Sequence, residues 1–235
     1  MSDARRAELA AGLDDVRRRI ATAADAAGRD PAEVALVVVT KTWPTSDIRL
    51  LRELGVRDIG ENRHQEAEQK AAELADLDIT WHFVGQVQSN KASRIAGYAD
   101  VVHSVDSVKV VRRLQKGAHD RGQPVDCLLQ VNLDPAEVRA GRGGLSAAEI
   151  DAVAAEVEAA GALRLRGVMG VAPLGQDPRP AYERLAEISH QLRVGHPTAA
   201  LISAGMSGDF EVAVATGATH VRVGSAVLGE RPPLG

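Results

Sequence analysis

The sequence predicts an α/β protein: a (β/α)8 barrel of the TIM type with an extra helix at its N-terminus. Short apolar runs alternate with longer amphipathic stretches along the chain, as expected of parallel strands joined by helices. About eight such runs occur in 235 residues, close to the usual length of this fold, and a helical pattern follows nearly every one. A doubly wound open sheet is the main alternative, because counting strands in one sequence does not separate the two folds.

The opening helix starts near residue 2, carries Leu9, Leu13, Val16 and Ile20 at helical spacing, and stops at Gly28. We expect strands at residues 35–40, 58–60, 80–84, 100–104, 125–132, 164–169, 200–203 and 219–223. The intervening helices are expected at residues 46–54, 62–74, 91–96, 107–122, 146–160, 180–194 and 206–216. A Gly/Arg-rich stretch at 139–144 predicts a mobile loop on the ligand side. Because no linker interrupts this order, residues 1–235 are expected to form one domain.

Composition excludes several classes of protein. The net charge of −4 argues against a general nucleic-acid binder, and aromatic residues, at 3%, offer no stacking surface for bases. The single cysteine, Cys127, excludes an internal disulfide framework, fits a reducing compartment and is expected to be a buried structural thiol. The seven histidines show no metal-ligand spacing, so no metal site is predicted. With no signal peptide, membrane span or exposed apolar helix face in the pattern, we expect a cytoplasmic monomer.

Lys41 is the most informative residue in the chain. It closes the run Val34-Ala35-Leu36-Val37-Val38-Val39-Thr40, whose continuous apolar character predicts a parallel strand buried on both faces. The C-terminal end of such a strand points into the mouth where barrels bind ligands. A lysine amine in a partly apolar pocket has a lowered pKa and acts as a nucleophile, as Schiff-base chemistry requires. The alternative is a lysine that extends its ammonium into solvent.

Two glycine- and serine-containing stretches predict an anion site at the same mouth. Gly205-Met206-Ser207 is expected to open the helix after the seventh strand, and Gly224-Ser225 a short helix after the eighth. The N-terminus of a helix presents unpaired N–H groups, glycine lets the main chain approach a phosphate, and serine adds a hydroxyl donor. Loops after strands seven and eight are the usual phosphate site of barrels. The alternative is that these glycines only allow tight turns.

Three further polar residues have more than one interpretation. Arg222 could bind a phosphate, hydrogen-bond a ring nitrogen and keep it unprotonated, or form a salt bridge with Glu230 or Asp209. His82 lies inside a predicted strand, where a hydrogen-bonded core histidine is expected more often than a general base. Glu61 is either a buried acid or a helix cap.

A reactive lysine beside a phosphate site in a barrel suggests pyridoxal 5′-phosphate, and at this point the sequence resembles a known family. The matching segments are Val39-Thr40-Lys41-Thr42, Gly60-Glu61-Asn62, Trp81-His82-Phe83-Val84-Gly85, Gln88-Ser89-Asn90-Lys91, Arg164-Leu165-Arg166-Gly167, Gly205-Met206-Ser207 and Val221-Arg222-Val223-Gly224. In this order they resemble the YggS/PROSC family, the pyridoxal phosphate homeostasis proteins. Each segment is a weak signal, but the ordered set is highly specific.

The resemblance implies a barrel of the alanine racemase N-terminal type that holds pyridoxal 5′-phosphate covalently, as an internal aldimine with Lys41. It places the phosphate on Ser207 and on the backbone of Gly224 and Ser225, with Arg222 facing the pyridine nitrogen. An arginine there disfavours the protonated pyridinium and weakens the electron sink that most pyridoxal enzymes exploit. The predicted cofactor-binding residues are Lys41, Asn62, His82, Ser203, Met206, Ser207, Arg222, Gly224 and Ser225. No residue is predicted to be catalytic.

Three functions compete at this stage. The first is a pyridoxal phosphate-binding protein that carries or buffers the cofactor, supplies apo-enzymes, and maintains vitamin B6 and amino-acid homeostasis without robust catalysis. The second is an amino-acid racemase, which needs an acid/base on each face of the substrate carbanion. In fold-type III racemases the second group is a tyrosine of a separate C-terminal β-domain, for which we expect no room after Pro233, and Tyr98 and Tyr182 are expected away from the strand C-termini. The third is an aldolase or isomerase that acts on a phosphorylated sugar through Lys41. We predict the first.

Overall fold

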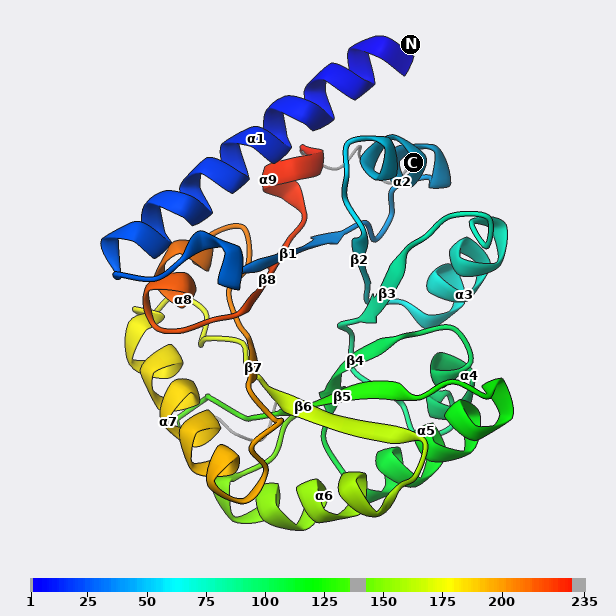
Figure 1. The fold of residues 1–235 in the computed structure, drawn as a ribbon, viewed down its shortest axis with the longest axis vertical. Helices are drawn as coiled ribbons and strands as arrows, with labels where there is room; N and C mark the ends of the chain where they lie inside the picture. The colour runs from blue at the N-terminus through cyan, green and yellow to red at the C-terminus, as the bar shows by residue number, and fades with distance from the viewer. Residues whose placement is uncertain (1, 136–142, 230–235) are drawn as a thin grey trace.

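The computed structural model of the chain describes residues 2–135 and 143–229. Eight parallel strands close into a barrel in sequence order, β1 to β8, and the last strand pairs with the first (Figure 1). The predicted (β/α)8 fold is therefore confirmed, and an open doubly wound sheet is excluded because it has no such closing pair. Residues 139–142 of the predicted Gly/Arg-rich loop lie outside the described residues.

The strands are short, and most predicted boundaries differ from the observed ones by only a few residues. They are β1 Ala35–Val39, β2 Asp58–Glu61, β3 Thr80–Phe83, β4 Val101–Val105, β5 Val125–Gln130, β6 Leu163–Met169, β7 Leu201–Ser203 and β8 His220–Val223. The helices that cover the barrel are α2 Thr45–Glu53, α3 His64–Glu73, α4 Ala92–Ala96, α5 Val108–Arg121, α6 Ala147–Ala159, α7 Arg179–Gly195, α8 Phe210–Ala215 and α9 Ser225–Leu228. A 3-10 turn, Pro31–Glu33, precedes β1.

The predicted N-terminal helix is α1, Ser2–Ala26, which lies along the outside of the barrel beside α8 and α9 (Figure 1). Its apolar stripe is buried, with Leu9 and Val16 fully covered. Gly12 lets the helix approach α9 closely, because a Cβ there would lie 2.5 Å from the Val227 carbonyl oxygen. Burial of this stripe, rather than helix propensity alone, holds α1 in place.

The barrel interior holds both apolar and polar side chains. Val101, Leu128 and Met169 form an apolar cluster separate from the layer between sheet and helices. His103, two residues after Val101 on β4, and Ser203, on β7, are fully buried polar side chains. Interiors of such barrels are usually filled by branched apolar side chains, so buried polar groups in this position have to satisfy one another by hydrogen bonds.

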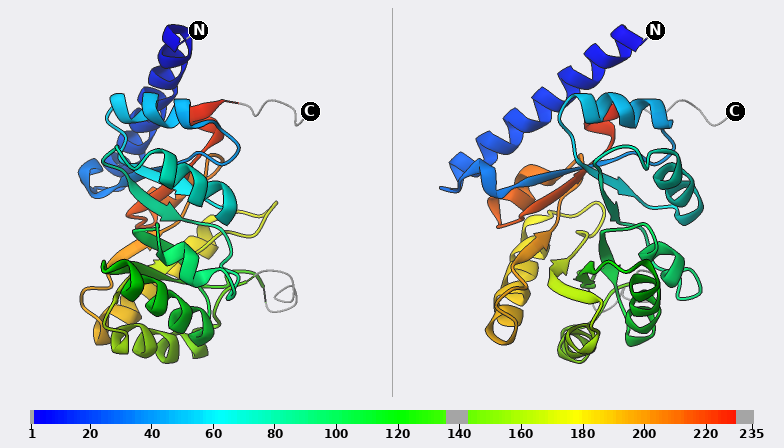
Figure 2. Two further views of the ribbon diagram at one scale, coloured as in Figure 1. Left: turned by 90° about the vertical axis from the view of Figure 1, so that its right-hand side faces the viewer. Right: turned by 45° about the vertical axis from the view of Figure 1, so that its right-hand side comes forward.

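The two ends of the barrel are distinct. In the left view of Figure 2, the loop that follows β6, residues 170–178, projects at the right, which is the far side in Figure 1. Figure 1 therefore looks at the end where the strands begin, and the strand C-termini face away from the viewer. In the described ranges, no helix combines the length and the apolar character needed to cross a membrane.

Candidate functional site

A cavity of about 430 Å³ lies at the C-terminal ends of the strands, between β1, β2, β8 and the loop after β7. It is lined by Val39, Lys41, Asn62, Val84, Val171, Met206, Ser207, Gly208, Arg222, Gly224 and Ser225. The structure thus brings together the predicted cofactor-binding residues, apart from His82 and Ser203, which do not line this cavity. Its volume is in the range of sites for small ligands.

Lys41 is placed by a tight turn directly after β1. Thr40 continues the strand through a hydrogen bond from its N–H to the Gly60 carbonyl oxygen, and the Trp43 N–H then turns back to the Thr40 carbonyl oxygen. Thr42 has a φ of 69°, a left-handed conformation that is strained for a β-branched residue. Its N–H donates to Glu66 Oε1 at 2.6 Å, which helps to hold the turn. Lys41 is therefore carried on a backbone fixed from both sides.

A buried ion cluster lies behind this turn. Lys70 is 6% exposed and Glu61 is 1% exposed. Lys70 Nζ donates to the Thr40 carbonyl oxygen at 2.8 Å and to Oε1 of both Glu61 and Glu66 at 2.7 Å. Burial raises the pKa of Glu61, while Lys70 and the Thr40 hydroxyl act to lower it. The choice left open for Glu61 is resolved in favour of a buried acid.

The cluster ties the Lys41 turn to helix α3. Lys70 was not among the predicted residues, because its only local signal is its (i, i+4) spacing from Glu66 on α3. Three carbonyl or carboxylate oxygens around one ammonium satisfy the donor capacity of that group. The turn that presents Lys41 therefore depends on a lysine that is distant in the sequence.

The predicted anion site is built from the loop after β7 and the start of α9. Ser207 Oγ accepts hydrogen bonds from the N–H groups of Gly224 at 3.3 Å and Ala226 at 3.4 Å. The prediction that Gly224-Ser225 opens a short helix is confirmed, because α9 begins at Ser225. The two N–H groups thus converge on the Ser207 hydroxyl, and Ser207, Gly224 and Ser225 all line the cavity.

The prediction that Gly205-Met206-Ser207 opens a helix is wrong, because α8 begins at Phe210. The Asp209 carboxylate accepts the Met206 N–H at 2.6 Å, which closes a turn ahead of the helix. Gly205 has a φ of 88°, and a Cβ there would lie 2.7 Å from Phe210 Cα. The glycine is therefore needed for the turn and for close packing, while Ser207 still faces the cavity.

Arg222 forms the inner wall of the cavity and is 5% exposed. Its Nη1 donates to Ser203 Oγ at 2.5 Å and its Nη2 to the Gly170 carbonyl oxygen at 3.0 Å. Burial lowers the pKa of Arg222 to about 10, so the guanidinium stays charged at neutral pH. The hydrogen bonds of Arg222 go to neutral oxygens instead of a carboxylate. Of the two salt-bridge partners considered, Asp209 hydrogen-bonds elsewhere and Glu230 lies outside the described residues.

Tyr182 is nearer to the site than the sequence indicated. Both tyrosines were expected away from the strand C-termini, but the Tyr182 hydroxyl donates to Asp209 Oδ2 at 2.7 Å, in the loop that carries Met206 and Ser207. Burial raises the pKa of Tyr182, so the phenol remains protonated. The side chain reaches this loop because α7 packs against the end of the barrel, which its position within a helix did not reveal.

Two smaller cavities adjoin the main one at the same mouth. One of about 290 Å³ shares Val84 and Val171 with it, and one of about 250 Å³ shares Asn62. The side chain of Gln86 lines both of the smaller cavities. The mouth therefore extends beyond the space around Lys41.

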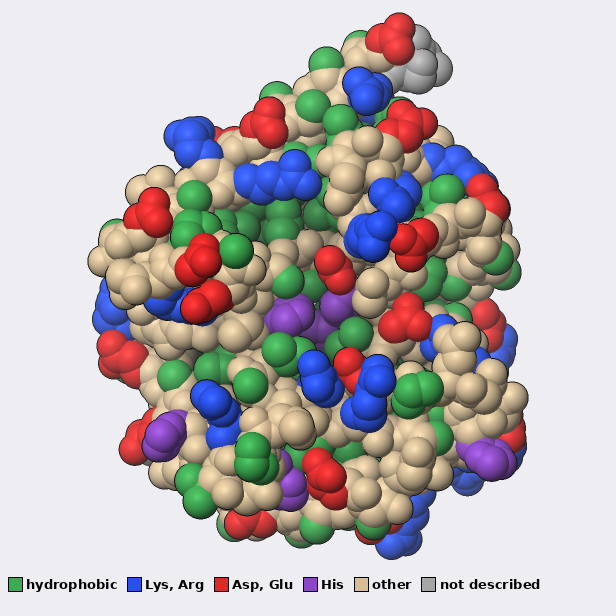
Figure 3. Space-filling model, viewed as in Figure 1, with side chains coloured by type: hydrophobic (Ala, Val, Ile, Leu, Met, Phe, Trp, Pro, Cys, Tyr) green, Lys and Arg blue, Asp and Glu red, His purple; other side chains and the backbone are tan. Residues whose placement is uncertain are grey.

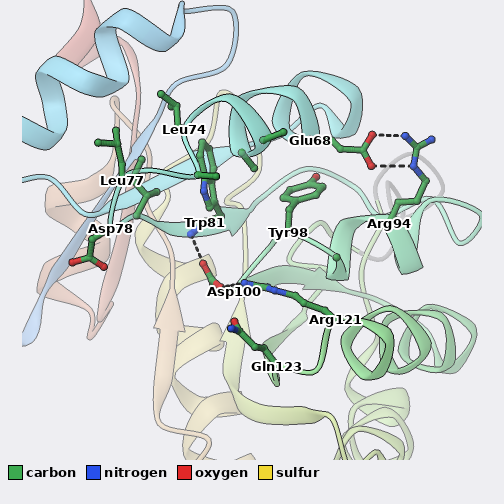
Figure 4. Close-up of a pocket in the computed structure, with 15 residues that line it drawn as sticks. Glu68, Leu74, Leu77, Asp78, Trp81, Arg94, Tyr98, Asp100, Arg121 and Gln123 are labelled. Atoms are coloured by element: carbon green, nitrogen blue, oxygen red, sulfur yellow. Dashed lines mark hydrogen bonds and ion pairs between the residues drawn. The ribbon is translucent and has the colours of Figure 1, made fainter.

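A larger cavity of about 700 Å³ lies outside the barrel, between α3, α4 and the end of α5 (Figure 4). Its charged groups pair with one another: Arg94 pairs with Glu68, and Arg121 Nη2 donates to Asp100 Oδ1 at 2.6 Å. The Asp100 carboxylate also accepts the Trp81 N–H at 2.8 Å. Because Trp81 and Asp100 lie at the beginnings of their strands, this cavity is remote from the strand C-termini. It shows no converging reactive groups.

The fold and the site define a class: barrels that present a lysine beside glycine- and serine-containing turns at one mouth. The family model for the N-terminal domain of alanine racemase matches residues 12–232. The chain is 41% identical to the pyridoxal phosphate homeostasis protein of Mycobacterium leprae and 42% identical to that of Pseudomonas aeruginosa. The first alignment covers 96% of this chain and 93% of the relative, and the second 95% and 96%. The chain therefore belongs to the pyridoxal phosphate homeostasis protein family, as its motifs indicated.

Solved structures agree with this assignment. The structure of PipY from Synechococcus elongatus with pyridoxal phosphate bound has a TM-score of 0.81 and 34% identity, over 94% of this chain and 100% of that one. An alanine racemase from Streptomyces coelicolor has a TM-score of 0.69 at 18% identity and covers 97% of this chain but 59% of its own. The second likeness concerns the fold alone.

Proposed function

We propose that this protein binds pyridoxal 5′-phosphate in the cavity at Lys41 and serves vitamin B6 homeostasis as a carrier or buffer of the cofactor. One observation carries the proposal: a lysine side chain, the serine and glycine pair Ser207 and Gly224 at the start of α9, and a buried arginine line a single cavity. These are the groups that an aldehyde, a phosphate and a pyridine nitrogen require. The names of the relatives and the ligand of PipY support the same interpretation.

The cavity also holds an unsatisfied polar atom that fits this ligand. Asn62 Oδ1 is buried and has no hydrogen-bond partner, which is costly unless a ligand provides a donor. Rotation of the Asn62 amide would turn its NH2 group toward the 3-oxygen of pyridoxal phosphate, which accepts hydrogen bonds when the cofactor is joined to a lysine. Asn62 would thus complete a set of contacts in which each polar group of the cofactor has a counterpart on this chain.

Each residue has a distinct role in the proposal. Lys41 would hold the cofactor through its amine, because bound pyridoxal 5′-phosphate would supply an aldehyde with which an amine condenses. Ser207 and the N–H groups of Gly224 and Ser225 hold the phosphate, and Arg222 donates toward the ring nitrogen, which it keeps unprotonated because a cation disfavours a second positive charge. The lysine retains the cofactor, while the arginine limits its reactivity.

A carrier is favoured over a racemase by the placement of the tyrosines. The Tyr182 hydroxyl is committed to Asp209, and the pKa of the phenol is raised by burial, so it is not poised to abstract a proton. Tyr98 lies in the outer cavity (Figure 4), and its ring stacks on that of His64. Neither supplies a second acid/base beside Lys41.

The proposal extends to the oligomeric state of the protein, its location and the proteins that receive the cofactor. We propose a cytoplasmic monomer that passes the cofactor to apo-enzymes. The large apolar side chains exposed in the described part of the chain are the separated residues Leu174, Val194 and Met206, rather than one patch. The buried thiol of Cys127 is suited to a reducing compartment.

Borohydride labelling tests the proposal. The purified protein, incubated with pyridoxal 5′-phosphate, is expected to show a yellow absorption band that borohydride bleaches, with the reduced label mapping to Lys41. Lys41→Ala should lose the reducible band and keep the fold, since the residue ends a strand. Lys91→Ala is the matched control, because Lys91 lines an adjoining cavity and should leave the band unchanged. A reducible band that persists in Lys41→Ala would sink the assignment.

A further inference from the structure

Five side chains from different strands form one continuous chain of hydrogen bonds through the barrel interior. His82 Nε2 lies 2.9 Å from Asp58 Oδ1, and His82 Nδ1 lies 2.8 Å from His103 Nε2. His103 Nδ1 then lies 2.8 Å from Ser203 Oγ, which accepts from Arg222 Nη1 at 2.5 Å. The step from His103 on β4 to Ser203 on β7 crosses the lumen. The chain ends at the arginine that lines the cofactor cavity.

The chemistry of the two ends determines the direction of every bond. A guanidinium only donates, so Ser203 accepts from Arg222 and can give its own proton to His103 Nδ1. His103 then carries its proton on Nε2 and donates to His82 Nδ1. His82 in turn carries its proton on Nε2 and donates to the Asp58 carboxylate. Both histidines are neutral Nε2–H tautomers in this arrangement.

The hydrogen-bond chain connects the two ends of the barrel. His103 and Ser203 are completely buried and His82 is 3% exposed, whereas the Asp58 side chain is 37% exposed where β2 begins. Figure 3, which looks at the end of the barrel where the strands begin, shows histidine side chains at the centre of that face. Arg222, at the other end of the chain, faces the cavity. Solvent at one end of the barrel is thus joined by hydrogen bonds to the cofactor site at the other.

The charged surroundings favour the same proton arrangement. Burial lowers the pKa of His103 well below its ordinary value, and nearby His82 and Arg222 lower it further. Burial, the largest single effect, raises the pKa of Asp58, but the hydrogen bond from His82 and the nearby His82, His220 and Arg57 together outweigh it, and the net pKa is lowered. His220, whose ring lies 6.4 Å from the rings of both other histidines, has its pKa lowered by burial to about 4. The hydrogen-bond chain requires neutral histidines between the Asp58 carboxylate and the Arg222 guanidinium.

We propose that Asp58, His82 and His103 are positioning residues for the cofactor site. They orient the Ser203 hydroxyl so that its lone pair faces Arg222, and they thereby hold the guanidinium in one orientation at the cavity wall. If every hydrogen bond between His82 and Ser203 ran in the opposite direction, the hydroxyl proton of Ser203 would have no acceptor beside the guanidinium. This inference rests on the proposed function for the role of Arg222, but the proton arrangement itself is a property of the protein alone.

The tautomers are tested first, in the cofactor-free protein. Long-range ¹H–¹⁵N NMR correlations of the histidine rings are expected to show His82 and His103 as neutral Nε2–H tautomers near neutral pH. Asp58→Asn, which can donate as well as accept, should introduce the Nδ1–H form at one or both rings. Nδ1–H or doubly protonated rings in the unaltered protein would overturn the proposal, whatever the cofactor does.

Cofactor affinity is then measured by titration of the band described above. Asp58→Asn should weaken the binding of pyridoxal 5′-phosphate by roughly twofold to tenfold, about the contribution of one hydrogen bond. Asp126→Asn is the matched control: it removes a carboxylate that pairs with Arg164 where β5 begins, outside the histidine chain, and should leave affinity unchanged. If Asp58→Asn and Asp126→Asn weakened cofactor binding equally, the proposed role of the hydrogen-bond chain would be contradicted.

A double-mutant cycle tests whether the effect passes through Ser203. In a Ser203→Ala background the hydrogen-bond chain is interrupted at Ser203, so Asp58→Asn should cause no further loss of affinity. A full additional loss would show that Asp58 acts by another route and would refute the positioning role. If the unaltered protein fails to bind pyridoxal phosphate at all, the proposed function falls, while the tautomer measurement still decides the hydrogen-bond chain.

Discussion

Replacing Lys70 with methionine tests how the Lys41 turn is held in place. Methionine has a length and volume close to those of lysine but carries no charge, so the packing of α3 on the barrel is preserved. The Lys70 ammonium makes three hydrogen bonds, to the Thr40 carbonyl oxygen and to the carboxylates of Glu61 and Glu66. Because Glu61 is 1% exposed, the substitution leaves its carboxylate buried without a cation.

The expected cost follows from this burial. Removing one partner of a buried ion pair destabilises a protein by about 3–5 kcal/mol, since the remaining charge is uncompensated. For a chain of this size, each kcal/mol lowers the melting temperature by about 2–4 °C, which gives a decrease of roughly 6–20 °C. The pKa of Glu61, already raised by burial, would rise further without Lys70. Protonation of Glu61 then favours the folded state, so the loss should be smaller at acidic pH than at neutral pH.

Thermal unfolding followed by circular dichroism measures the effect. Lys116→Met is the matched control, because Lys116 pairs with Asp120 on the surface of α5 and its side chain is 63% exposed. That substitution should change stability by no more than about 0.5 kcal/mol. If Lys70→Met loses no more stability than Lys116→Met, or if its loss grows as the pH falls, the reasoning about the buried cluster is refuted.

Two further predictions concern the packing of α1 and the histidines of the barrel. Gly12→Ala should destabilise the protein although alanine favours helices, since its Cβ would meet the Val227 carbonyl oxygen at 2.5 Å; Gly195→Ala in α7, which has open space, should be neutral or stabilising in the same unfolding assay. Burial lowers the pKa of His103, and that of His220 to about 4, so below about pH 6.5 the unfolded chain binds more protons than the folded one. The stability that comes from keeping these histidines neutral should therefore be complete above that pH, and the free energy of unfolding should decrease as the pH falls toward 4. The decrease should be shallower in His220→Asn. An identical pH dependence in that variant would contradict the assignment.

Much of the fold could be predicted because its signals are local. Continuous apolar runs mark parallel strands, helical spacing marks the covering helices, and their regular alternation indicates a barrel. The parallel arrangement also brings distant residues together, since all strand C-termini of such a barrel face one end. Lys41, Ser207 and Gly224 could therefore be assigned to one site from their positions in the sequence. The start of α8 could not, because the Asp209 carboxylate, through its contact with the Met206 N–H, displaces the helix start by several residues.

Local patterns along the chain thus specify the order of elements, the end of the barrel where the candidate site lies, and the residue types that suit a phosphorylated aldehyde. The pairing of buried polar groups follows only from the closed barrel. Lys70 reaches Thr40, and His103 reaches Ser203 across the lumen, because the register and closure of the barrel place these side chains opposite one another. No local pattern encodes such pairs. Contacts across a closed interior depend on the positions of all eight strands together, whereas spacing along the chain specifies each strand separately.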